Sequence, residues 1–121
     1  MTLIKILVVD DDADVLDMVK TMLENAGMVP TCISNPEKLI PQIEAILPDI
    51  IIMDIYLRVA DGRELCHHLR ASAAYSTIPV LLYSAGNITR ESLQQSMASG
   101  FIAKPFDMDH LLKTIHLLAN K

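Results

Sequence analysis

Short aliphatic runs alternate along the chain with longer segments whose apolar residues recur at helical spacing. The first run, residues 4–9, is aliphatic except for Lys5 and is too apolar for a strand with one face in water. The segment 49–54 carries three consecutive isoleucines and is the most strand-like of all. By this criterion the chain has five predicted strands, at residues 4–9, 29–34, 49–54, 79–83 and 101–103.

Five helices are predicted between and after these strands. In residues 13–26 the apolar positions recur every three or four residues, and Gly27 follows as a stop. Asn35 and Pro36 form a cap and first-turn pair for a helix to residue 46, inside which Pro41 predicts a kink or a later start. The remaining helices are predicted at residues 62–71, at 89–98 and after Asp107, which caps the last one. Short apolar strands separated by helices imply an α/β fold whose parallel sheet is covered on both faces.

Length and composition bound the domain organisation and the class of function. The 121 residues (13.4 kDa) suffice for one domain, and 51% hydrophobic with 21% charged residues is too apolar for a disordered chain. Ten basic against fifteen acidic residues give a net charge of −5, which argues against direct nucleic-acid binding. Cys32 and Cys66 lie in apolar segments and are predicted to be reduced core thiols. Since the chain has neither a signal-peptide pattern nor an apolar run of membrane-spanning length, we expect a cytoplasmic protein with no membrane partner.

Polar residues stand at the carboxyl ends of the predicted strands, where ligands bind in open parallel sheets. They are Asp10, Asp11 and Asp12 after the first strand, Asp54 at the third, Ser84 at the fourth and Lys104 at the fifth. Crowded carboxylates repel one another and are held by a cation or change their pKa, and an all-oxygen site without histidine or cysteine suits Mg²⁺. Asp12 is interpreted as a helix cap, and simple solvation stays the alternative for Asp10 and Asp11. Together these groups supply what phosphoryl transfer requires: an acceptor, a metal cage, a cation and a hydroxyl donor.

Five short motifs occur in order along the chain. They are ILVVDDD at residues 6–12, PDIIIMD ending at Asp54, the Asp61 and Gly62 pair, PVLLYSA containing Ser84, and KPF starting at Lys104. With these motifs the sequence resembles the receiver domain of bacterial two-component response regulators over essentially its whole length. The resemblance implies a doubly wound, flavodoxin- or CheY-like α/β fold with strand order 2-1-3-4-5 and five helices, in one receiver domain spanning residues 1–121.

The resemblance also implies a role for each site residue. Asp54 is the expected phosphoacceptor, which receives its phosphoryl group from a sensor histidine kinase or a histidine phosphotransfer protein. Mg²⁺ is the expected cofactor, ligated directly by Asp11, Asp54 and the backbone carbonyl of Tyr56 and through water by Asp10. Ser84 and Lys104 are expected to contact phosphoryl oxygens, Ser84 and Phe101 to act as switch residues, and the bond before Pro105 to be cis. Such a module controls an unidentified downstream target or output domain, and it catalyses only its own phosphorylation and dephosphorylation.

The sequence departs from the family pattern in two places, and two further positions bear on dephosphorylation. Arg58 stands four residues after the acceptor, where the family usually has proline, and should change the loop that follows. The segment between Ser84 and Lys104 is about two residues short, in a region that many DNA-binding members use as a dimer face. Tyr56 and Gly86 occupy positions that tune dephosphorylation in the family, and a bulky tyrosine there would shield the acyl phosphate from water.

Two other functions stay open. A small phosphohydrolase resembling the haloacid dehalogenases would use a nucleophilic aspartate on the first strand, and Asp10 with Asp12 matches the start of that motif. A degenerate receiver would act as a docking module that does not depend on phosphorylation. A phosphatase assay and a phosphorylation assay distinguish these functions from the leading one.

The first predicted helix has a wide apolar face. Leu16 and Met18 border its central stripe, and the whole arc covers about 160°, more than a core-facing stripe requires. We expect one border to be exposed beside residues 104–106, as part of a surface on which the kinase docks. The alternative is that both borders are buried.

Overall fold

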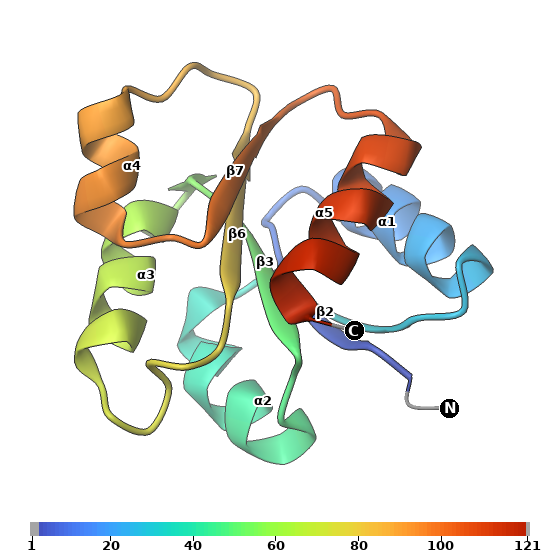
Figure 1. Ribbon diagram of the computed structural model, residues 1–121, viewed down its shortest axis with the longest axis horizontal. Coiled ribbons are helices and arrows are strands. Elements are labelled where there is room, and N and C mark those ends of the chain that lie inside the picture. Colours follow the sequence, from blue (N-terminus) through green and yellow to red (C-terminus); the bar gives the residue numbers. More distant parts are fainter. Residues whose placement is uncertain (1–2, 121) are drawn as a thin grey trace.

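The computed structural model describes residues 3–120 and has the doubly wound α/β fold predicted from the sequence (Figure 1). Five parallel strands form one sheet in the order β2-β1-β3-β6-β7, which is the expected order 2-1-3-4-5 once a short separate hairpin is set apart. The strands of the sheet are β1 (Lys5–Val9), β2 (Val29–Ile33), β3 (Ile50–Asp54), β6 (Val80–Ser84) and β7 (Gly100–Ala103). The helices are α1 (Ala13–Asn25), α2 (Leu39–Ile46), α3 (Gly62–Ala71), α4 (Arg90–Ser96) and α5 (Met108–Ala119).

Helices cover both faces of the sheet, with α1 and α5 on one face and α2, α3 and α4 on the other (Figure 1). Successive side chains of a strand point to opposite faces. In β1, Ile6 and Val8 therefore pack with α1 and α5, whereas Leu7 and Val9 pack with α2 and α3. Every residue of β3 and β6 is buried, so these central strands are the near-continuous hydrophobic runs that a doubly covered parallel sheet requires.

The second helix starts later than its cap, one of the two outcomes that Pro41 predicts. A 3-10 turn, η1 (Pro36–Lys38), follows the Asn35 cap, and α2 then begins at Leu39. Pro41 is the third residue of α2, where a backbone N–H would have no acceptor within the helix. The proline therefore sits in the first turn and breaks no helical hydrogen bond.

A two-stranded antiparallel hairpin, β4 (Tyr56–Leu57) and β5 (Ala60–Asp61), follows β3 and was not predicted. Arg58 and Val59 form its turn, where the departure from the family pattern at Arg58 predicted only a changed loop. The hairpin returns the chain to the end of β3, where the Gly62 N–H donates to the Ile55 carbonyl at 2.7 Å. A Cβ atom at residue 62 would overlap the backbone carbonyl oxygen of Asp54, so this close approach needs glycine.

Other segments match the prediction within a few residues. The fourth helix is shorter than the predicted 89–98, because Thr89 caps it through the Ser92 N–H and Met97 ends it in the left-handed conformation. Cys32 and Cys66 are free thiols, and burial raises the pKa of Cys66 to about 11. Among residues 3–120, no helix has the length and apolar character needed to cross a bilayer.

Candidate functional site

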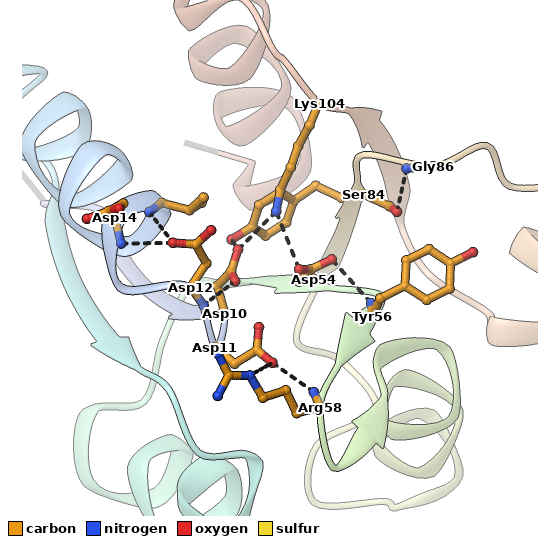
Figure 2. Close-up of polar contacts among 12 residues, drawn as sticks. Asp10, Asp11, Asp12, Asp14, Asp54, Tyr56, Arg58, Ser84, Gly86 and Lys104 are labelled. Carbon is orange, nitrogen blue, oxygen red and sulfur yellow. Dashed lines mark hydrogen bonds and ion pairs between the residues drawn. The ribbon is translucent and has the colours of Figure 1, made fainter.

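The predicted site residues come together at the carboxyl ends of the central strands (Figure 2). Asp10 follows β1, Asp54 ends β3, Ser84 ends β6 and Lys104 follows β7. The sheet order reverses between β1 and β3, so this edge is the position where open α/β sheets bind their ligands. Asp10, Asp54 and Ser84 are buried, although each carries a polar side chain.

Three carboxylates form a cluster with the spacing of a metal site. Asp10, Asp11 and Asp54 each offer one oxygen, and these oxygens all lie within 4.8 Å of one another. Asp10 and Asp54 are buried, whereas Asp11 is half-buried. A set of carboxylate oxygens without nitrogen or sulfur ligands fits a hard divalent cation such as Mg²⁺.

The Asp10 carboxylate is held by three donors. The Asp12 N–H donates to Oδ1 at 2.8 Å, while the Tyr83 hydroxyl and the Lys104 ammonium donate to Oδ2 at 2.6 and 3.1 Å. Burial is the main cause of a pKa of Tyr83 well above its ordinary value, and the bond to Asp10 raises it further, so the phenol stays a donor. Tyr83 is not among the site residues predicted from the sequence, because a tyrosine within an apolar strand is typical of the core.

Lys104 is the cation that lies between the two buried acids. Its Nζ is 3.1 Å from Oδ2 of Asp10, 3.4 Å from Oδ2 of Asp54 and 4.4 Å from the centre of the Tyr83 ring. Burial raises the pKa of Asp54, and the charge of Lys104 opposes that effect without cancelling it. The peptide bond between Lys104 and Pro105 is cis, as predicted.

Ser84, Gly86 and Tyr56 lie on the side of Asp54 away from Asp12 (Figure 2). The Gly86 N–H donates to Ser84 Oγ at 3.0 Å, and the Tyr56 N–H donates to Asp54 Oδ1 at 3.2 Å. The Tyr56 side chain is 54% exposed and points away from the acid cluster toward Gly86. Phe101, the other expected switch residue, is half-buried and packs against the core on the α2–α3 face of the sheet.

Asp11 and Asp12 are adjacent but have different partners. Asp12 accepts the N–H groups of Asp14 and Val15 and caps α1, in agreement with its interpretation as a helix cap. Asp11 accepts the Arg58 N–H at 2.8 Å, and its Oδ2 lies 3.6 Å from Nε of the same arginine. The proline usual in the family at this position has no N–H to give, so the departure at Arg58 supplies Asp11 with a hydrogen bond.

Comparison with known proteins agrees with this geometry. The family model "Response regulator receiver domain" matches residues 6–116. RpaA of Synechocystis sp., a DNA-binding dual master transcriptional regulator, is 31% identical over 97% of this chain. The alignment covers 49% of RpaA, so the chain spans about half the length of that relative.

Two solved structures share the fold over nearly the whole chain. The chemotaxis response regulator CheY4 of Vibrio cholerae is 26% identical with a TM-score of 0.87, and the match covers 97% of this chain and 99% of CheY4. The receiver domain of a sensor histidine kinase from Pseudomonas aeruginosa also has a TM-score of 0.87, covering 99% of this chain and all of that one. It is 24% identical, which shows a common fold, and its own active-site cleft coordinates a magnesium ion.

The hydrogen bond between Tyr83 and Asp10 predicts a stability effect. Tyr83→Phe keeps the ring but removes one donor from a carboxylate that is 0% exposed. We expect the free energy of unfolding, measured by urea denaturation in EDTA, to fall by about 1–3 kcal/mol. Tyr75→Phe is the matched control, since that hydroxyl donates to Glu44 at the surface, and it should leave stability almost unchanged. Equal effects of the two substitutions would contradict a structural role for the buried bond.

Proposed function

The chain belongs to the response regulator receiver domain family, and from that premise we propose that it is a phosphorylation-switched module of a two-component system. The observation that carries the proposal is the buried Asp54 carboxylate, with Lys104 Nζ at 3.4 Å and two further carboxylates within metal-binding distance. Asp54 is the phosphoacceptor. We assign residues 1–121 to one receiver domain and expect it in the cytoplasm.

In the proposed transfer, an Asp54 carboxylate oxygen attacks the phosphorus of a phosphohistidine on the kinase or phosphotransfer protein. The new P–O bond forms as the P–N bond breaks, and the imidazole nitrogen leaves with the bonding electron pair. Lys104 balances charge on a phosphoryl oxygen, and the hydroxyl of Ser84, at the end of β6, donates to another. No other substrate is proposed for the domain.

The acid cluster is the proposed Mg²⁺ site. Asp11, Asp54 and the backbone carbonyl of Tyr56 would hold the ion directly and Asp10 through water. When bound, Mg²⁺ neutralises charge on the phosphoryl oxygens during transfer. The three clustered carboxylate oxygens support this assignment, because a divalent cation relieves their mutual repulsion.

Phosphorylation would then change which partner the domain binds. Ser84 is expected to move toward the phosphoryl group and Phe101 to change its side-chain conformation in response. The partner is a downstream target or an output domain. RpaA binds DNA, but the chain matches about half of RpaA and carries a net charge of −5, so we propose no direct DNA binding by the chain itself.

The burial of Asp10 supports Asp54 as the acceptor in preference to the aspartate that follows β1. Asp10 is 0% exposed and engaged by three donors, whereas a nucleophile must reach the phosphorus of its donor. Lys104 also contacts both Asp10 and Asp54, so the acceptor and its cation are in place. This arrangement favours a phosphorylated module over a degenerate docking domain.

Asp54→Asn should abolish labelling by acetyl phosphate in the presence of Mg²⁺, because an amide cannot form the acyl phosphate. The measurement is the incorporation of labelled phosphate into the purified protein. Asp12→Asn is the matched control and should be labelled normally, since asparagine also caps helices. Full labelling of the Asp54→Asn protein would show that the acceptor lies elsewhere.

Asp11→Asn should weaken Mg²⁺ binding about tenfold or more, and Asp12→Asn by less than about twofold. The reason is that an oxygen of Asp11 belongs to the carboxylate cluster, whereas Asp12 is turned toward the first turn of α1. A calorimetric titration with MgCl₂ measures both affinities. Equal losses in the two variants would overturn this division of roles.

An apolar groove beside the site is the proposed kinase-docking surface. It has a volume of about 290 Å³ and is lined by Val15, Met18, Ala85, Lys104, Pro105 and Phe106. Met18 is 49% exposed, while Leu16 is half-buried against the core, so the expectation that one border of the α1 face is exposed is confirmed.

Met18→Ala should slow phosphotransfer from the cognate kinase several-fold and leave labelling by acetyl phosphate unchanged, because the small donor needs no protein interface. Leu117→Ala serves as the control, because Leu117 is also an exposed apolar residue but lies on α5 and does not line the groove. This change should affect neither reaction. If Met18→Ala slows both donors equally, the defect lies in the fold or the pocket and the docking surface is wrong.

A further inference from the structure

The β4–β5 hairpin contacts the acid cluster through Asp11. Oδ2 of Asp11 accepts the backbone N–H of Arg58, in the turn of the hairpin, at 2.8 Å. The other carboxylate oxygen of Asp11 points toward Asp10 and Asp54 (Figure 2). Asp11 therefore connects two parts of the structure, because one of its oxygens is bonded to the hairpin and the other faces the cluster.

This hydrogen bond fixes a carboxylate that has few other partners. Asp10 is held by three donors, whereas the only donors to the Asp11 carboxylate among residues 3–120 are the N–H and the side chain of Arg58. The Arg58 side chain is 85% exposed and its Nε is 3.6 Å from Oδ2, so water and salt weaken that ion pair. The backbone N–H is therefore the contact that sets the direction of the Asp11 carboxylate.

The hairpin holds this N–H in place. Its two strands pair with Leu57 opposite Ala60, and the Gly62 N–H donates to the Ile55 carbonyl at their base. Arg58 lies in the turn between the strands, and its N–H bonds a group outside the hairpin, 47 residues away in the sequence. The fold thus directs a fixed donor at a residue of the proposed Mg²⁺ site.

We propose that the β4–β5 turn is a working part of the Mg²⁺ site, in which the Arg58 N–H is a positioning group that holds Asp11 with one oxygen toward the ion. The inference rests on the proposed function, since it needs a divalent cation at the acid cluster. Hydrogen bonds to ligating carboxylates raise metal affinity, because a ligand that is already oriented loses less freedom when the ion binds. Arg58 acts on the ion through Asp11 and is not itself a ligand.

Two substitutions at Arg58 isolate the N–H. Arg58→Ala keeps it and Arg58→Pro removes it, while both remove the guanidinium, so the difference between the two variants measures the donor alone. Proline is compatible with this position. Arg58 is not among the residues with positive φ, and Leu57 before it lies in a strand, the extended conformation that is favoured before proline.

The measurement is a calorimetric titration of the full chain with MgCl₂ and no phosphodonor. Arg58→Pro should bind Mg²⁺ about tenfold more weakly than Arg58→Ala, the lower end of the loss expected when a hydrogen bond to a metal ligand is removed. Val59→Ala is the control in the same turn. Val59 is 77% exposed, so its variant should bind Mg²⁺ like the wild type.

A second comparison tests whether the N–H acts through Asp11. In the Asp11→Ala background, Arg58→Pro and Arg58→Ala should bind Mg²⁺ equally, because the acceptor of the N–H is gone. If Arg58→Pro lowers the melting temperature in EDTA, an ester in place of the amide bond between residues 57 and 58 of the Arg58→Ala chain removes the same N–H without the proline ring. It should give the same tenfold loss.

Two results would overturn the inference: equal Mg²⁺ affinities of the chains with and without the N–H, or a tenfold difference that persists in the Asp11→Ala background. Either can occur while the wild type binds Mg²⁺ and is labelled at Asp54, which would leave the proposed function intact. A wild-type chain that binds no Mg²⁺ would instead overturn both the proposed cation site and the inference that rests on it.

Discussion

Two carboxylates, those of Asp10 and Asp54, are buried side by side at the end of the sheet, and the rest of the site depends on how their charges are offset. Burying one charge is costly and burying two of the same sign is more so, unless partners compensate. Lys104 lies within 3.4 Å of both acids, and Tyr83 with the Asp12 N–H completes the donors around Asp10. Asp11 adds a third carboxylate, and even with Arg58 Nε at 3.6 Å from it the cluster has more carboxylates than cations. A divalent cation bound at the cluster would offset the remaining negative charge.

The parallel sheet brings these groups together from positions far apart in the chain. Asp10 and Lys104 are paired although 94 residues separate them, because β1, β3, β6 and β7 all end at the same edge. The two aliphatic cores on either side fix the strands rigidly, so the charged ends cannot move apart to relieve repulsion. The fold therefore holds an unfavourable electrostatic arrangement in place, and in the proposed function that arrangement would favour the binding of a cation beside the acceptor.

Sequence patterns predict the regular strands and helices and the polar residues that end the strands. Apolar runs and helical spacing locate the strands and helices, and the polar residues at strand ends locate Asp10, Asp54, Ser84 and Lys104. The β4–β5 hairpin was missed because two-residue strands leave no periodicity. Tyr83 was missed because a tyrosine in an apolar strand is typical of the core. A buried tyrosine hydroxyl needs a hydrogen-bond partner, however, so Tyr83 could have indicated a polar group near the end of its strand. Arg63 contacts Tyr56 of the hairpin and Ser92 of α4. Because these partners come from separate elements, no local sequence pattern predicts the contacts.

Chemical location of the phosphoryl group tests Asp54 as the acceptor most directly. The chain is incubated with acetyl phosphate and Mg²⁺ and then reduced with borohydride, which converts a phosphorylated aspartate to homoserine, and the modified peptide is identified by mass spectrometry. If Asp54 is the acceptor, homoserine should form at residue 54 alone, and only when Mg²⁺ is present. Modification at Asp10 or Asp11, or none at any aspartate, would contradict it.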